Sequence, residues 1–307
     1  MARKGTGMRM WRKGLGVRSV TAVAGVTALL ALAGCSAGDP NAEARAATSP
    51  PARAKASPRP KGPQWDTSPG SLAALGDSIT RGFDACDALA DCPEVSWATG
   101  TSGDVDSVAA RLGTPANRVW NFARTGAQMD DLPAQTDEAI ARKPELVTIL
   151  MGANDACVTT PTAMTSVGTY RQTFASVLAE LRQRLPKTQV YVSSVPNLER
   201  LWKVGHNNEM TRRIWSLGIC QSMLKSPVSF DPQTVNRRTA VLDRVRAYNE
   251  ALRTECAKHP LCRYDEGATF TFAFTPSHLS KWDYFHPNKS GQGELAELAY
   301  DRITGGA

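Results

Sequence analysis

Between residues 71 and 307, short apolar runs alternate with longer segments of mixed polarity, and this alternation restricts the possible folds more than any other feature. The runs that we interpret as buried strands are 72–75, 118–123, 146–151 and 189–194. The segments that we interpret as helices are 129–142, 168–185, 235–258 and 288–303. Strands that alternate with helices form parallel sheets covered by helices. The sequence therefore predicts an α/β domain, a three-layer α/β/α sandwich with a mainly parallel sheet.

Residues 196–234 are less regular, and their larger apolar side chains, Trp202, Trp215, Met223 and Phe230, show little periodicity. One interpretation is an insertion near the rim of a site. The other is ordinary core packing, and the sequence does not separate the two.

The first 35 residues have the pattern of an export signal. They contain six basic residues and no acidic residue, and a short apolar run at 20–33 follows the basic start. A transmembrane helix needs about 20 apolar residues, so this run fits a secretory signal better. The run ends in Leu-Ala-Gly followed by Cys35, which resembles a bacterial lipobox. That resemblance implies cleavage before Cys35 and lipidation of this residue; the alternative is a plain secretory signal with an incidental cysteine.

Residues 36–70 are rich in Pro, Ala, Ser, Lys and Arg and show no apolar periodicity. This composition predicts a disordered, extended linker. We therefore expect one folded domain at 71–307, which the linker holds away from a membrane anchor at Cys35.

The net charge of +7 at first suggests a nucleic-acid partner. Most of this charge belongs to the signal and the linker, since residues 71–307 contain 25 basic and 26 acidic residues. A domain so close to neutrality lacks the electrostatic signature of nucleic-acid binding. We therefore expect no nucleic acid among its partners.

Six cysteines remain once Cys35 is assigned to lipid, and an even number in an exported chain favours disulfides. We expect the pairs that follow the sequence order, because two of them close very short loops. These pairs are Cys86–Cys92, Cys157–Cys220 and Cys256–Cys262. The alternative is free buried thiols. No pair has the Cys-x-x-Cys spacing of a zinc site, so we expect no structural metal.

Ser78 follows the first predicted strand directly, in the segment Gly76-Asp77-Ser78. In α/β folds, ligands bind at the carboxyl ends of the strands, and a serine at the start of a helix has a free N–H. The segment differs from the Gly-x-Ser-x-Gly motif of α/β-hydrolases, because Thr80 stands in place of the second glycine. By itself, Gly-Asp-Ser is more often a turn or a helix cap.

His286 stands just before the last predicted helix, and Asp283 precedes it by three residues. A catalytic serine hydroxyl needs a base, which is usually a histidine. One turn that holds both residues would let the carboxylate accept from a ring nitrogen and fix the tautomer. His259, beside Pro260, has instead the position of a helix cap.

Two further candidates follow the second and third predicted strands. Gly126 lies where a backbone N–H could approach a ligand closely. Asn154 lies just past the third strand, and its side-chain amide is a donor that never titrates. Each could also be an ordinary turn residue. A parallel sheet would gather both near Ser78 as donors of an oxyanion hole.

These residues, in this order, resemble the SGNH/GDSL hydrolase family, which is named for a Ser, a Gly, an Asn and a His in separate sequence blocks. Ser78, Gly126, Asn154 and His286 match those four residues, and Asp283 matches the acid of the Asp-x-x-His pattern. The resemblance covers nearly all of the expected domain and implies a flavodoxin-like SGNH hydrolase fold.

Two details refine the resemblance. The first block reads Gly-Asp-Ser-Ile-Thr rather than Gly-Asp-Ser-Leu, which leaves the serine intact. The stretch from Thr125 to Cys157 is similar to the phospholipase-B-like branch of the family.

The resemblance implies a serine esterase or lipase. Ser78 would attack an ester carbonyl, His286 would take the proton, and Asp283 would orient His286. The N–H groups of Ser78 and Gly126 and the amide of Asn154 would bind the oxyanion. No metal or organic cofactor is implied.

The sequence indicates the type of reaction more closely than it indicates the substrate. We expect a lipid or short acyl ester, with an acetylated carbohydrate as the alternative. A surface binding module that has lost catalysis is a further alternative, which the complete set of motif residues disfavours. We expect a monomeric enzyme that is exported and is either secreted or anchored by lipid to the outer face of the cell membrane.

Overall fold

The computed structural model describes residues 64–305. The expected signal at 1–35 with Cys35, and most of the expected linker, lie outside the described residues, so both remain predictions. Within the described part of the chain, no helix is long and apolar enough to cross a membrane.

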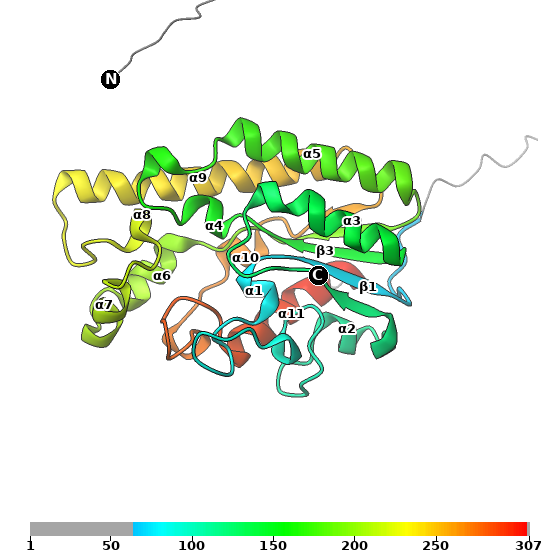
Figure 1. Cartoon of the computed structure of the whole chain (residues 1–307), viewed down its shortest axis with the longest axis horizontal. Coiled ribbons are helices and arrows are strands. Elements are labelled where there is room, and N and C mark those ends of the chain that lie inside the picture. Colours follow the sequence, from blue (N-terminus) through cyan, green and yellow to red (C-terminus); the bar gives the residue numbers. More distant parts are fainter. Residues whose placement is uncertain (1–63, 306–307) are drawn as a thin grey trace, which may run out of the picture. The chain divides into compact units, whose positions relative to one another are not determined.

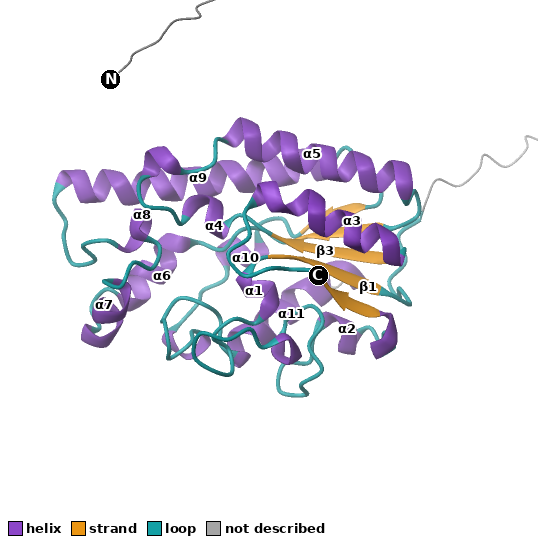
Figure 2. Ribbon diagram, in the orientation of Figure 1, coloured by secondary structure: helices purple, strands orange, loops and turns teal. Residues whose placement is uncertain are grey.

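Five parallel strands form one sheet in the order β2-β1-β3-β4-β5 (Figure 2). The strands are β1 (Leu72–Gly76), β2 (Val119–Asn121), β3 (Leu146–Leu150), β4 (Gln189–Val192) and β5 (Cys262–Tyr264). Every residue of β1, β3 and β4 is buried. Burial on both faces explains their largely unbroken apolar runs, which are typical of a parallel sheet.

The strand order reverses at β1. The chain runs from β1 to β2 on one side and then returns to β3 on the other, so that Leu72 lies opposite Val119 in β2 and opposite Leu146 in β3. Ligands of open α/β sheets bind beyond the carboxyl ends of the strands at such a reversal. The loops after β1 and β3 are therefore the expected place for chemistry.

The helices cover the sheet on both sides. The α-helices are α1 (Ser78–Arg81), α2 (Val108–Arg111), α3 (Leu132–Arg142), α4 (Ala153–Ala156), α5 (Val167–Arg184), α6 (Leu198–Gly205), α7 (Glu209–Trp215), α8 (Gln221–Leu224), α9 (Pro232–Cys256), α10 (Ala268–Thr271) and α11 (Lys289–Thr304) (Figure 1). Short 3-10 helices occur at η1 (Pro93–Val95), η2 (Ala116–Arg118), η3 (Met129–Asp131), η4 (Pro161–Ala163) and η5 (Pro276–His278).

The helices form two layers around the sheet. Helices α3, α5 and α9 lie on one face, and α2 and α11 lie on the other (Figures 1 and 2). Tyr170 of α5 stacks on Tyr248 of α9 with 4.1 Å between the ring centroids, and both side chains are fully buried. The predicted three-layer α/β/α architecture is confirmed.

Side-chain caps begin the long helices where polar residues precede the apolar pattern. Ser166, Asp231 and Asn288 each accept a hydrogen bond from the N–H three residues further on, at 3.1, 2.9 and 3.0 Å. These bonds satisfy N–H groups that have no partner inside a helix. They place the starts of α5, α9 and α11 close to the predicted positions.

One strand was not predicted. β5 has only three residues, which is too short for a periodic pattern, and its first residue forms a disulfide with the end of α9. The four predicted strands and four predicted helices are present, with shifts of a few residues at their ends.

Residues 196–234 are more regular than the sequence suggested, since they form α6, α7 and α8. Trp202, Trp215 and Met223 are buried in the main core, whereas Phe230 is largely exposed. For three of the four large side chains, the core-packing interpretation is therefore correct. None of these helices is longer than eight residues, which is too short for a helical period to stand out in the sequence.

The folded part begins before the expected boundary at residue 71. The indole N–H of Trp65 donates to the Ile303 carbonyl at 2.8 Å, and the guanidinium of Arg263 lies 4.2 Å from the centre of the indole ring. Gln189 donates to the Asp66 carbonyl at 2.9 Å. The expected linker at 36–70 is therefore too long at its carboxyl end, since Trp65 and Asp66 already contact the domain. The proline-rich composition around Trp65 concealed this contact in the sequence.

Three disulfides join the pairs expected from the sequence. Cys86–Cys92 closes the loop after α1, Cys157–Cys220 ties the loop after α4 to the start of α8, and Cys256–Cys262 joins α9 to β5. The alternative of free buried thiols is wrong for all six of these cysteines.

The disulfide between Cys157 and Cys220 should stabilise the domain most. Its cysteines are 63 residues apart, so its removal by a double alanine substitution should lower the free energy of unfolding by about 4 kcal/mol. The same change at Cys256 and Cys262, which are 6 residues apart, should cost only about 2 kcal/mol. Urea denaturation of both variants measures the difference, and a larger loss at the short loop would contradict this entropic explanation.

Candidate active site

Ser78 lies where a buried strand turns into a helix. It is the first residue of α1, and Asp77 caps this helix by accepting from the Ile79 N–H at 2.9 Å. Only glycine fits at position 76, because a Cβ there would stand 2.5 Å from the Leu150 carbonyl oxygen of β3. This close packing at the end of β1 holds Ser78 in place, with 5% of its surface exposed.

Ser78, His286 and Asp283 form one hydrogen-bonded chain. Ser78 Oγ lies 2.8 Å from His286 Nε2, and His286 Nδ1 is hydrogen-bonded to Asp283 Oδ2. A carboxylate only accepts, so Nδ1 carries the ring proton and Nε2 accepts from the serine hydroxyl. In this arrangement a hydroxyl can lose its proton as it attacks an electrophile.

A tight turn holds Asp283 and His286 together. Asp283 Oδ1 accepts from the backbone N–H of Phe285 at 2.8 Å and of His286 at 3.0 Å. The carbonyl of His286 accepts from the Ser280 N–H at 2.8 Å. The turn leads directly to Asn288, the N-cap of α11. These backbone hydrogen bonds hold the turn rigid, so that Asp283 faces Nδ1 of the imidazole and fixes the orientation of the ring.

Asp283 and His286 shift each other's pKa. Burial disfavours the charged imidazole, but the hydrogen bond and the charge of Asp283 outweigh burial and raise the pKa of His286 above 6.5. Burial also disfavours the charged carboxylate, but the hydrogen bond and the charge of His286 hold the pKa of Asp283 below its usual value. The pair therefore favours an ionised Asp283 beside a histidine that accepts a proton readily.

Gly126 lies in the segment after β2 and Asn154 lies in α4, just after β3, and β2 and β3 are the two neighbours of β1 in the sheet. Gly126 has a left-handed φ of +83°, and no atom lies within 4 Å of the place where a Cβ would stand. Asn154 Nδ2 donates to the Ala127 carbonyl at 2.9 Å, which ties the two segments together. The amide has a second N–H, and the N–H of Ser78 has no partner within α1. The N–H groups of Ser78 and Gly126 and the second N–H of the Asn154 amide are therefore candidate donors to a ligand.

An apolar pocket lies beside His286. Its lining residues are Ile79, Ala153, Pro196, Leu198, Leu201, Phe274, Leu279, Phe285, His286 and Pro287. Its volume is only about 10 Å³, which is about the space of one water molecule. The walls therefore lie close to each other, and a bound group of any length would have to displace them.

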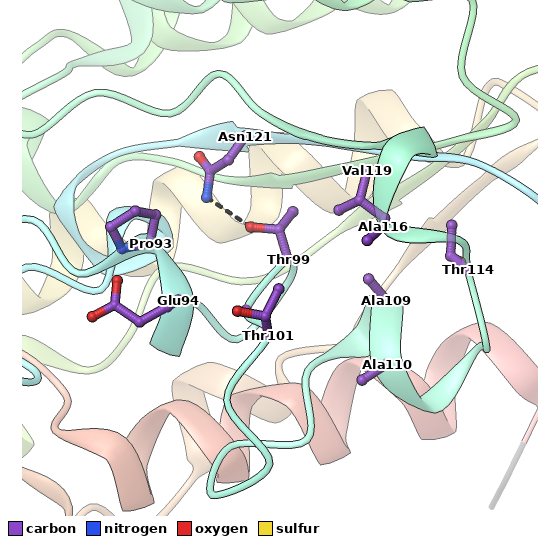
Figure 3. A pocket seen from close by; sticks show the side chains of 11 residues that line it. Pro93, Glu94, Thr99, Thr101, Ala109, Ala110, Thr114, Ala116, Val119 and Asn121 are labelled. Carbon is purple, nitrogen blue, oxygen red and sulfur yellow. Dashed lines mark hydrogen bonds between the residues drawn. The ribbon is translucent and has the colours of Figure 1, made fainter.

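A larger cavity, of about 480 Å³, lies elsewhere, along α2 and β2 (Figure 3). Its labelled residues include Glu94, Thr99, Thr101 and Asn121, and Asn121 donates to Thr99 Oγ1 at 2.9 Å. It is not lined by Ser78, His286 or Asp283. The size of this cavity therefore gives no information about a reaction at Ser78.

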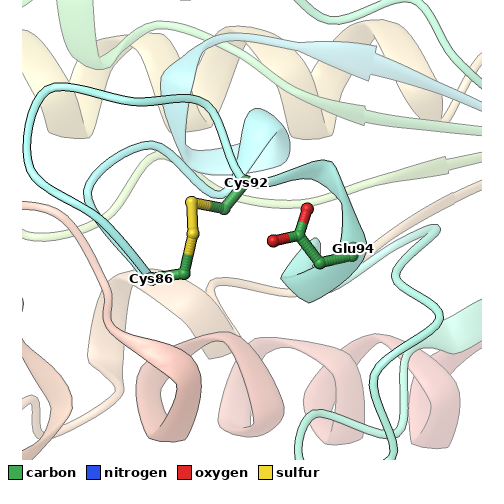
Figure 4. A group of neighbouring side chains, drawn as sticks. All are labelled: Cys86, Cys92 and Glu94. Atoms are coloured by element: carbon green, nitrogen blue, oxygen red, sulfur yellow. A yellow bond between two sulfur atoms is a disulfide. The ribbon is translucent and has the colours of Figure 1, made fainter.

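Two groups of side chains within the described residues have the closeness that a metal ion would need. In the first, Cys86 and Cys92 stand beside Glu94, but their sulfur atoms are joined as a disulfide and cannot act as thiolates (Figure 4). In the second, Asp84 stands beside Asp283 and His286, but His286 Nδ1 is already hydrogen-bonded to Asp283. We assign no metal to either group.

The family of the chain follows from its sequence and agrees with this geometry. A model of the GDSL-like lipase/acylhydrolase family matches residues 74–293, which include Ser78, Gly126, Asn154 and His286. The chain belongs to this family, and it is a hydrolase of carboxylic esters. No curated protein matches the sequence.

Several solved structures are similar to this chain. A catalytic mutant of an acetylxylan esterase from Geobacillus stearothermophilus has 20% identity and a TM-score of 0.48, over 76% of this chain and 94% of that one. An extracellular lipase from Streptomyces rimosus has 18% identity and a TM-score of 0.45, over 75% and 97% of the two chains. An acetyl xylan esterase has 13% identity and a TM-score of 0.48, over 75% and 98%.

Sequence reasoning missed two parts of the site. Asp84 is buried next to Asp283, but it lies in a loop without a motif. The apolar pocket joins side chains such as Leu198 and Phe274 from distant segments. The position of Phe285 next to His286 was the one signal that could have pointed to an apolar wall.

The pH dependence of ester hydrolysis should report His286. Three carboxylates, Asp283, Asp77 and Asp84, act on its ring, and each favours the charged form. Because the attacking serine needs a neutral base, kcat/KM should fall as the pH drops through the raised pKa of His286. The midpoint of this acid limb should therefore lie above 6.5. A nitrophenyl ester assay across the acid and neutral range measures it, and a midpoint at or below that value would contradict the assignment.

Proposed function

We propose that the protein hydrolyses esters by acyl transfer first to Ser78 and then to water. Ser78 Oγ bonds to the ester carbonyl carbon while its proton moves to His286 Nε2. The tetrahedral intermediate collapses, the bond to the alcohol oxygen breaks, and the alcohol leaves with the proton from His286. Water then repeats the sequence on the acyl-serine, which releases the acid and restores Ser78.

In this mechanism Asp283 orients His286 and stabilises its charged form. The negative charge on the carbonyl oxygen is met by the N–H groups of Ser78 and Gly126 and by the amide of Asn154. Fixed donors of this kind are usually the largest electrostatic contribution to acyl transfer.

A single observation carries this proposal. The hydroxyl of Ser78 lies 2.8 Å from Nε2 of His286, although the two residues are 208 positions apart in the sequence. A helix-capping serine would need no such partner, and Asp77 already caps α1.

The substrate that we propose is an ester of a short acyl group. The support comes from the pocket beside His286, which is apolar and so narrow that a longer chain would require a larger movement of its walls. An O-acetylated carbohydrate is the second candidate, since its acyl group is small. This narrow pocket gives less support to a lipid ester as the substrate, and hence to a kinship with the phospholipase-B-like branch.

We also propose that the enzyme is exported and monomeric. Disulfides persist in oxidising compartments outside the cytoplasm, and the described residues contain three of them. The Leu-Ala-Gly-Cys35 segment supports a lipid anchor, and the Pro-rich residues that follow support a spacer between the membrane and the domain.

Substitutions at Ser78 and Asn154 test the assignment of roles. Ser78→Ala should leave only residual hydrolysis of a nitrophenyl ester, whereas Asn154→Ala should lower kcat by roughly 10²–10³, the usual effect of losing one oxyanion donor. Ser277→Ala, a change at an exposed serine near the same histidine turn, should leave kcat unaltered. Full activity of the Ser78 variant would refute the mechanism, and unchanged kcat at Asn154 would remove that residue from it.

The pocket can be tested through the acyl chain. Nitrophenyl acetate and butyrate should be cleaved faster than the octanoate, and Leu201→Ala should shift the preference toward the longer chain by enlarging the pocket. Leu181→Ala, at a fully buried leucine of α5 that does not line the pocket, controls for a general loss of stability. A preference for octanoate in the native enzyme would rule out the short-acyl substrate.

A further inference from the structure

Asp84 lies in the loop after α1, and the proposed mechanism does not use it. Only 2% of its surface is exposed. A carboxylate oxygen of Asp84, one of Asp283 and a ring nitrogen of His286 all lie within 4.8 Å of one another. A second buried carboxylate therefore stands beside the pair that would activate the serine.

The surrounding structure holds Asp84 in this position. Its N–H donates to the Ala90 carbonyl at 3.0 Å, and its own carbonyl accepts from Ser280 Oγ at 2.7 Å. Its φ of +57° is in the left-handed region, which aspartate tolerates better than most residues. Ser280 belongs to the turn that carries Asp283, so its hydroxyl connects the two loops directly. These hydrogen bonds thus hold the backbone of Asp84 next to the turn that carries Asp283 and His286.

The same loop also contacts the imidazole directly. The ring of Phe83, the neighbour of Asp84, meets His286 edge to face with 5.1 Å between the ring centroids. The Cys86–Cys92 disulfide closes the loop behind them. Phe83 and Asp84 therefore both lie next to the His286 ring, one with an aromatic side chain and the other with a carboxyl group.

A structural role accounts for only part of these observations. Asp84 Oδ1 accepts from the Leu89 N–H at 2.5 Å, which is a loop contact that an asparagine would make equally well. An ionisable group beside another buried carboxylate costs free energy that a neutral loop residue would not. The burial of Asp84 and the charge of Asp283 raise the pKa of Asp84 to about 6. The two carboxyl groups therefore act on each other directly, and the ionisation of one disfavours the ionisation of the other.

We propose that Asp84 is a positioning residue for ester hydrolysis, a second buried carboxylate that supports the charged form of His286 together with Asp283. The inference rests on the proposed function, in which His286 takes the serine proton. Two carboxylates near the ring stabilise the developing imidazolium more than one does. If Asp283 is removed, Asp84 still leaves a negative charge in the cluster and becomes the main partner of the ring.

Direct titration of His286 tests the charge coupling without any turnover. In the Ser78→Ala protein, ¹⁵N NMR of the imidazole should show that Asp84→Asn lowers the His286 midpoint by about one pH unit, the usual effect of one nearby opposite charge. Asp77 and Asp283 remain in place, so the change reports the loss of the Asp84 carboxyl together with its effect on Asp283. Asp87→Asn makes the same change at an exposed position of the same loop and should leave the midpoint unaltered. An equal midpoint in the Asp84→Asn and native proteins would overturn the proposal.

A double-mutant cycle tests the functional consequence. Asp84→Asn should lower kcat/KM only a few-fold in the native enzyme, but by about tenfold or more in the Asp283→Ala enzyme, where Asp84 is the remaining acid. Unchanged kcat/KM on Asp84→Asn in the Asp283→Ala enzyme would mean that Asp84 only caps its loop, which would refute the proposal. Thermal unfolding checks that each variant is folded, and Asp84→Ser provides a second neutral replacement that can still accept a hydrogen bond.

The two experiments also separate this inference from the proposed function. If Ser78→Ala retained full esterase activity, the mechanism would fail, but the NMR titration would still show whether Asp84 acts on His286. If the titration were unchanged while Ser78→Ala lost activity, the mechanism would stand and the role of Asp84 would be refuted.

Discussion

The parallel pairing of β1 with β2 on one side and β3 on the other is the constraint on which the site depends. It brings the carboxyl ends of three strands to one edge, so that the segments that follow these strands, with Ser78, Gly126 and Asn154, become neighbours. The close contact of Gly76 with the backbone of β3 fixes where the first segment begins. A side chain at Gly76 would separate these strands and move the serine away from its partners.

Four buried acids lie in the segments that carry Ser78, Asn154 and His286. Asp77, Asp84, Asp155 and Asp283 are all almost fully buried. Burial raises the pKa of Asp77 to about 7 and that of Asp155 to about 6, whereas Asp283 is held low by His286. Burying such groups costs stability. Of these four acids, Asp283 is the one held in its charged form, and its negative charge would stabilise the positive charge that His286 acquires in the proposed mechanism.

The core of the fold could be read from the sequence because its strands are buried on both faces. The run 72–75 is wholly apolar and the run 146–151 is broken only by Thr148, and polar caps such as Asp231 and Asn288 mark where helices begin. Elements whose stability comes from their neighbours gave little signal. β5 has three residues beside a disulfide, and the short helices between 196 and 234 are held by core contacts.

The sequence by itself determined the fold class, the family and the candidate residues for ester hydrolysis, because apolar periodicity and motif spacing are local properties of the chain. Only the tertiary structure decided that Ser78 meets His286 across 208 positions, that Asp84 lies beside Asp283, and that the apolar pocket is narrow. These features depend on distances between side chains from separate loops. Such distances arise only when the sheet and its covering helices have packed together.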